Sequence, residues 1–113
     1  MAPHIVFRAD ASAVMGAGHI SRCATLATSL KRHGCRITFI CAQGSSAFFP
    51  QVLEIADVVI DLPHAPGGDG AWLSVSQSVD AAATIFALAD SAPDWLVVDQ
   101  YGIDAAWERE VRE

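Results

Sequence analysis

The chain has 113 residues, of which 52% are hydrophobic and 18% are charged, so it fits one globular domain with a modest core rather than a disordered segment. Thirteen acidic residues stand against seven basic ones, for a formal net charge of −6, and the longest basic run is Lys31-Arg32, which argues against a nucleic-acid partner. The sequence contains no apolar stretch long enough for a membrane span and no signal peptide, so we expect a cytoplasmic protein. Cys23, Cys35 and Cys41 lack Cys-x-x-Cys spacing, which predicts reduced thiols near the core rather than metal ligands.

The amino-terminal third combines a strand, a glycine loop and a helix. Residues 4–10 have the composition of a strand, and residues 15–22 give Met-Gly-Ala-Gly-His-Ile-Ser-Arg. The helix that follows carries one apolar face, made of Ile20, Cys23, Ala24, Ala27 and Leu30. This order opens many α/β nucleotide-binding units, where glycines permit close approach of a ligand and a helix N-terminus favours an anion. On the loop alone, the simpler interpretation stays open that Gly16 and Gly18 make a tight turn and that His19 is a surface residue.

Strand and helix patterns alternate along the rest of the chain. Gly34 predicts a helix end, and Pro63 opens a long irregular loop over residues 63–71 that we interpret as a candidate lid. The remaining predicted elements are strands at 36–42, 58–62 and 95–99, an irregular helix at 45–55 interrupted near Pro50, a helix with apolar spacing at Val75, Val79, Ala82, Ala83 and Phe86, and a last helix with Ile103, Ala106, Trp107 and Val111 on one side.

Four successive strand–helix units predict an α/β fold in which a doubly wound, Rossmann-like parallel sheet forms a single domain over residues 1–113. Ligands of such sheets bind outside the carboxyl ends of the strands. That edge would gather Asp10 with the glycine loop, the loop at 63–71, and Asp99 with the residues after it.

Three known kinds of nucleotide or phosphate site are excluded, because the sequence lacks residues that each of them requires. NAD or FAD binding needs a third glycine and an acid after the second strand, but this chain has Ser21 and Cys41-Ala42-Gln43 there. A Walker loop needs Gly-Lys-Ser/Thr, but Gly18 is followed by His19. A phospho-receiver domain needs a late lysine, but Lys31 is the only lysine.

Three segments together resemble a known family. They are Phe-Arg-Ala-Asp-Ala-Ser at 7–12, Met-Gly-Ala-Gly-His-Ile-Ser-Arg-Cys at 15–23, and Asp-Trp-Leu-Val-Val-Asp-Gln-Tyr-Gly-Ile-Asp at 94–104. In order and spacing the chain resembles the amino-terminal half of the UDP-2,4-diacetamido-2,4,6-trideoxy-β-L-altropyranose hydrolases of pseudaminic acid biosynthesis, a pattern shared with spore-coat polysaccharide biosynthesis proteins. The resemblance implies a GT-B arrangement of two Rossmann-like domains, of which this chain matches the first and lacks the second, so that alone it is expected to be inactive.

The resemblance also implies roles for particular residues. His19 would be the catalytic base that activates water against the anomeric carbon, and a helix N-terminus, which disfavours imidazolium, suits that role. For substrate binding, Gly16 and Gly18 would let the backbone approach the sugar or its phosphate, and Tyr101 would line the sugar side of the cleft. Asp10 and Asp99 would contribute chiefly by orienting loops through backbone N–H groups.

The family pattern is not complete in this chain. Gln100 stands where family members frequently carry histidine, which puts a contribution from a second imidazole in doubt. No cofactor or metal is implied.

Two other functions share the expected fold. A UDP-sugar-dependent glycosyltransferase could use the same loop and histidine, and a non-catalytic fragment could only bind the sugar. We also expect self-association through an exposed sheet edge, because a four-stranded sheet leaves strand edges open.

Overall fold

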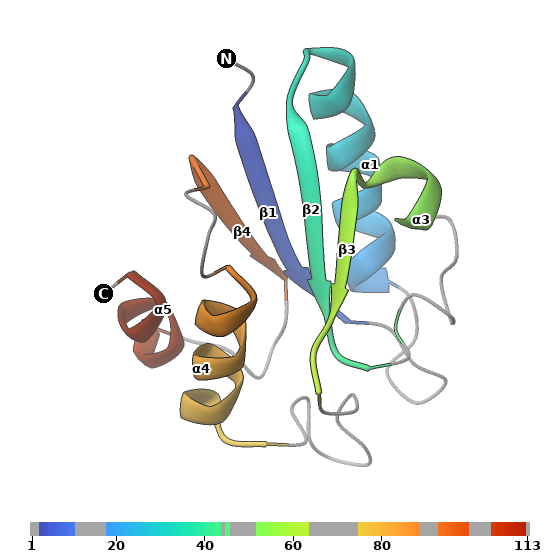
Figure 1. Cartoon of the computed structure of the whole chain (residues 1–113). Helices are drawn as coiled ribbons and strands as arrows, with labels where there is room; N and C mark the ends of the chain where they lie inside the picture. Colours follow the sequence, from blue (N-terminus) through green and yellow to red (C-terminus); the bar gives the residue numbers. More distant parts are fainter. Residues whose placement is uncertain are drawn as a thin grey trace.

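A computed structural model of the chain describes residues 3–10, 18–43, 45, 52–63, 75–88, 93–99 and 105–112. Its centre is one parallel sheet of four strands in the order β3-β2-β1-β4 (Figure 1). The strands are β1 (His4–Ala9), β2 (Arg36–Cys41), β3 (Val58–Asp61) and β4 (Trp95–Asp99), and the helices are α1 (Gly18–Arg32), α3 (Val52–Ile55), α4 (Gln77–Ala87) and α5 (Ala105–Arg112). The prediction of an α/β fold built on a parallel sheet is confirmed.

The two faces of the sheet carry separate apolar clusters because successive strand residues point to opposite sides. On one face Phe7 and Phe39 stack with ring centroids 4.9 Å apart and pack with Ile20, Cys23 and Ala27 of α1. On the other face, buried residues from three strands or their ends, Val6, Ile40 and Leu62, form a cluster with half-buried residues of α4. Figure 1 shows α1 and α3 beside one face and α4 and α5 beside the other.

The end of α1 lies where the sequence predicts it. Gly34 has a φ of 87°, in the left-handed region that favours glycine, and its N–H donates to the Lys31 carbonyl at 3.0 Å. Of the irregular helix expected at 45–55, residues 52–55 are helical as α3, and residues 46–51 lie outside the described part.

The apolar spacing correctly predicts that α4 is a helix, but of its four positions within α4 only Ala83 packs against the core, and the other three face outward. Val79, Ala82 and Phe86 are exposed, and the buried positions of α4 are Asp80, Ala81 and Thr84. The side of α4 that faces the core therefore carries mainly small and polar side chains. One of them, Asp80, forms an ion pair that is described below.

Candidate functional site

The carboxyl ends of the four parallel strands lie along one edge of the sheet, as the sequence predicts for a ligand site. Ala9, the last residue of β1, is in register with Asp99, the last residue of β4. Asp10 follows directly and is buried, with 1% of its surface exposed. Two predicted substrate-binding positions, Asp10 and Asp99, thus lie at neighbouring strand ends.

A buried arginine contacts Asp10 at this edge of the sheet. Arg8 of β1 is fully buried, and its Nη1 donates to Oδ1 of Asp10 at 2.5 Å. The same Oδ1 accepts the N–H of Ala42, the residue after β2, at 2.6 Å. Asp10 therefore joins the ends of the two central strands through one carboxylate oxygen.

The other side of the Arg8 guanidinium is held by α4. Its Nε and Nη2 donate to Oδ1 and Oδ2 of Asp80 at 3.0 and 2.5 Å, a bidentate pair. Oδ1 of Asp80 also accepts the indole N–H of Trp107, a fully buried residue of α5, at 2.8 Å. We call Arg8, Asp10, Asp80 and Trp107 the buried ion network.

The buried ion network keeps Arg8 charged. Burial by itself lowers the pKa of Arg8, but hydrogen bonds to Asp80 and the charges of Asp10 and Asp80 raise it above its ordinary value. Nearby, burial and the charge of Asp10 raise the pKa of the Cys41 thiol to about 12, so this cysteine stays protonated and poorly nucleophilic at neutral pH.

The predicted catalytic histidine lies in the first turn of α1. Helix α1 begins at Gly18, and its first turn contains no acidic residue that would occupy the positive end of the dipole. Gly18 is exposed and has no positive φ, and among the described residues only Nη1 of Arg22 comes within 4 Å of a Cβ built there, at 3.8 Å. The fold as described does not itself require glycine at this position.

Several predicted positions fall outside the described residues. These are Gly16, Tyr101, Gln100, the candidate lid at 64–71, and the side chains of His19 and Asp99. The structure therefore brings together the backbone positions of Asp10 and Asp99 and fixes the start of α1, and the roles of the remaining residues stay predictions.

No site role is predicted for Arg8, Asp80 or Trp107 from the sequence, although a signal for the first two exists. Arg8 is the one charged residue inside the apolar run Ile-Val-Phe-Arg-Ala, and Asp80 is the only charged residue of α4. A lone charge within a largely apolar element indicates that the residue is buried with a partner of opposite charge, although it does not identify that partner.

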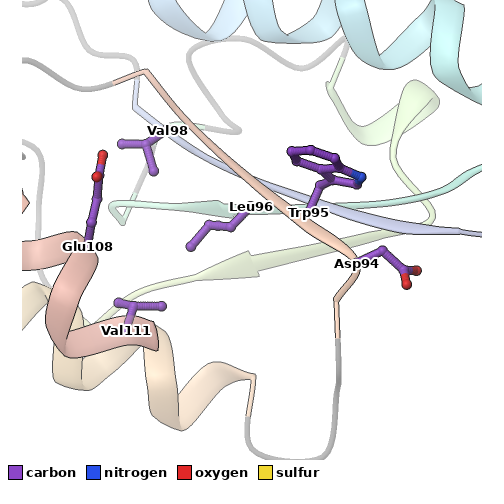
Figure 2. Close-up of a pocket in the computed structure, with 6 residues that line it drawn as sticks. All are labelled: Asp94, Trp95, Leu96, Val98, Glu108 and Val111. Carbon is purple, nitrogen blue, oxygen red and sulfur yellow. The ribbon is translucent and has the colours of Figure 1, made fainter. Parts of the chain in front are cut away.

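A cavity of about 410 Å³ lies between β4 and α5 (Figure 2). Leu96, Val98 and Val111 give it an apolar lining, and Asp94 and Glu108 add carboxylates. In Figure 2 Leu96 and Val111 point toward each other, whereas Trp95 projects from the opposite side of the strand. One carboxylate is already engaged, because Oδ2 of Asp94 accepts the N–H of His4 at 2.8 Å.

Comparison of the chain with protein-family models, with curated proteins and with solved structures gave no match. Within the described ranges, no helix is both long and apolar enough to cross a membrane.

Proposed function

We propose that this chain is a sugar-nucleotide-binding α/β domain of a hydrolase that releases UDP from UDP-2,4-diacetamido-2,4,6-trideoxy-β-L-altropyranose, with His19 as the base that activates water. The observation that carries the proposal is the position of helix α1. It begins with Gly18-His19, after the segment that connects it to Asp10 at the end of β1. Its first turn has no acid to compete with an anionic ligand. The three sequence segments that resemble the hydrolases supply the substrate class and the GT-B arrangement.

The local chemistry supports this role for His19. Inverting hydrolysis needs a base opposite the leaving group, and UDP is a good leaving group, so the demand on a protein acid is small. The positive end of α1 disfavours imidazolium and so favours the neutral ring that can accept a proton from water. Gly16, Gly18 and Tyr101 would contact the sugar nucleotide, with Asp10 and Asp99 holding the loops around it.

UDP release and substrate binding test the proposal together. Binding of the UDP-linked sugar to the chain would be measured by calorimetry, and UDP release would be measured with and without the carboxyl-terminal domain of such a hydrolase added separately. His19→Gln should retain binding and lose at least about a hundredfold in turnover, the usual range for a general base. His33→Gln is the matched control, because His33 lies just beyond the other end of α1, about 21 Å away along the helix axis, and its Nδ1 donates to the Ser29 carbonyl.

The outcomes separate the alternatives. Absence of both binding and release would contradict the proposal, and binding with release only when a sugar acceptor is present would identify a glycosyltransferase. Full turnover of His19→Gln would remove the histidine from the mechanism while leaving the substrate class intact.

A further inference from the structure

The sheet face that packs against α4 changes from apolar to charged as it approaches the carboxyl ends of the strands. Val6 lies there in a cluster of buried aliphatic side chains that contacts half-buried residues of α4. Arg8 lies on the same side of β1 as Val6, because successive side chains of a strand alternate between its two faces. It buries a guanidinium next to what we call the carboxyl edge, where Asp10 follows β1 and Ala42 follows β2.

Stability alone does not account for a charge at this place. A buried ion pair contributes little net stability compared with apolar side chains of similar size, because the cost of removing the charges from water offsets most of their attraction. An aliphatic residue in place of Arg8 would simply extend the cluster around Val6. The buried ion network is therefore better explained by what it holds in position.

The guanidinium of Arg8 connects Asp10 rigidly to α4. The two carboxylate oxygens of Asp80 accept its Nε and Nη2 at 3.0 and 2.5 Å, and this bidentate pair sets the plane and the direction of the guanidinium. Nη1 belongs to the same plane and donates to Oδ1 of Asp10 at 2.5 Å. Asp80 is itself held, since its Oδ1 accepts the indole N–H of Trp107 at 2.8 Å. A displacement of the Asp80 carboxylate should therefore move the carboxylate of Asp10.

Asp10 passes this constraint to the loops that follow both central strands. Its Oδ1 also accepts the N–H of Ala42 at 2.6 Å, and the Ala42 carbonyl accepts the N–H of Ser45, a fully buried residue, at 3.1 Å. In the other direction, the chain after Asp10 leads to α1, which begins at Gly18. One carboxylate oxygen thus sets how far apart the loops after β1 and β2 begin.

We propose that Asp80 of α4 is a positioning residue for the carboxyl edge: through Arg8 it holds the carboxylate of Asp10, and so fixes the loops that follow β1 and β2. Asp80 does this from the helix layer, without contacting a ligand. The effect on ligand binding rests on the proposed function, in which these loops surround the sugar nucleotide. The effect on Ala42 does not, and it is measured without a ligand.

Hydrogen exchange of the Ala42 amide, followed by NMR, tests the positioning by itself. In Asp80→Asn this amide should exchange at least tenfold faster relative to the amide of Phe39, which lies buried within β2. The ratio of the two rates is the informative quantity. A role of Asp80 in stability alone would accelerate both amides by one common factor, because both would exchange through global unfolding.

Thr84→Val is the matched control on the same helix. Thr84 is buried one turn after Asp80, and its hydroxyl donates to the main-chain carbonyl of Asp80 at 2.9 Å. The substitution removes a buried hydrogen bond but leaves both carboxylates and Arg8 in place, so the exchange ratio should not change.

A double variant decides the question if Asp80→Asn does not fold. Replacing both members of a buried ion pair with apolar side chains is tolerated far better than removing one member. Arg8→Met/Asp80→Leu should therefore fold, and it should raise the exchange ratio of Ala42 to Phe39 at least tenfold, because Asp10 has lost the guanidinium that orients it.

Calorimetric titration with the UDP-linked sugar measures the effect on the site. Asp80→Asn should bind at least tenfold more weakly than the unmodified chain, and Thr84→Val should bind equally well. The same loss is expected for Arg8→Met/Asp80→Leu.

The two measurements separate this inference from the proposed function. An exchange ratio that is unchanged, or that rises equally in Thr84→Val, would overturn the positioning role whatever the chain binds. A raised ratio with full affinity for the sugar nucleotide would also overturn it, because the loops that Asp80 holds would then not be those that the ligand uses. A raised ratio in a chain that does not bind the sugar nucleotide at all would support the positioning of the carboxyl edge and contradict the proposed function.

Discussion

Arg8 determines how the candidate site is connected to the rest of the protein. It lies in the central strand, fully buried, and its guanidinium joins the end of β1 to α4 and, through Asp80 and Trp107, to α5. Removing a charge from water costs several kcal/mol, which is offset here by a bidentate pair and a further carboxylate. Such a pair adds little net stability compared with apolar packing, but losing one partner is costly.

Arg8→Leu should therefore destabilise the fold by about 3–5 kcal/mol, because it leaves the carboxylates of Asp10 and Asp80 buried without their cation. The loss is a large fraction of the stability of a small domain and would be measured by urea unfolding at pH 7.

Arg36→Leu is the matched control for this change. Arg36 opens β2, in register with His4 of β1, and its side chain is exposed, so the same substitution should cost less than about 1 kcal/mol. Equal losses at the two positions would show that the buried ion network contributes nothing beyond an ordinary surface arginine.

The same residues mark the limit of prediction from sequence. The four strands are predicted within one residue of their observed ends, because a parallel sheet covered on both faces gives short, almost continuous apolar runs. The pairing of Arg8 with Asp80 joins positions 72 apart, and no local pattern specifies it. The spacing of Val79 and Phe86 predicts a helix but points to the wrong side, because the side chains of α4 that face the sheet are mostly small or polar and the large apolar ones are exposed. The roles of His19 and Tyr101 come from resemblance and stay predictions.

At the scale of one element, a substitution at the start of α1 can distinguish what the fold requires from what ligand binding requires. Gly18→Ala should leave stability unchanged or raise it by about 0.5 kcal/mol, because the backbone there is helical and alanine has the higher helix propensity. If the glycine serves close approach of a sugar nucleotide, binding should weaken at least tenfold, as measured by calorimetry.

Thr25→Ala is the control on the same helix, at an exposed position whose hydroxyl donates to the Ser21 carbonyl. It should leave binding unchanged. Unaltered binding by Gly18→Ala would mean that this glycine only starts the helix.

Asp57 connects three elements and gives the fold an acid-side pH dependence. Its Oδ2 accepts the N–H of Ile37 at 2.8 Å, its own N–H donates to the Ile37 carbonyl, and Lys31 of α1 lies 3.4 Å from Oδ1. The hydrogen bond from Ile37 is the main reason that the pKa of Asp57 lies below its ordinary value of 3.8, and Lys31 lowers it further. The folded chain thus binds fewer protons, so this stabilisation is complete above that value and is lost as the pH falls through the folded pKa.

Asp57→Asn should therefore lower the free energy of unfolding by about 1 kcal/mol at pH 7, a modest loss because the carboxylate is partly exposed. The difference from the unmodified chain should begin to close near pH 3.8, the ordinary pKa of the group, and should vanish as the pH falls through the lower folded pKa. Urea unfolding from pH 2.5 to 7 measures it, with the exposed Glu54→Gln on α3 as control. A constant difference at every pH would exclude the charge of Asp57 as its source.

At the scale of the whole molecule, the strand order places the candidate site over the most stable part of the sheet. Strand β1 is paired on both sides, and all its residues after His4 are buried, so Asp10 extends from the centre of the core. Within the described residues β3 pairs on one side only, is four residues long and has exposed ends. Local opening should therefore begin at β3 and leave β1 intact.

Amide hydrogen exchange followed by mass spectrometry measures this gradient directly. Peptides covering β1 should exchange only through global unfolding, and those covering β3 at least tenfold faster, because fewer buried contacts must break to open an edge strand. Arg8→Leu should accelerate exchange in β1 and α4 together, since the buried ion network joins them, whereas Arg36→Leu should not. Equal protection of β1 and β3 would indicate that the sheet opens as one unit. In that case β1, the strand that positions Asp10, would be no more stable than the edge of the sheet.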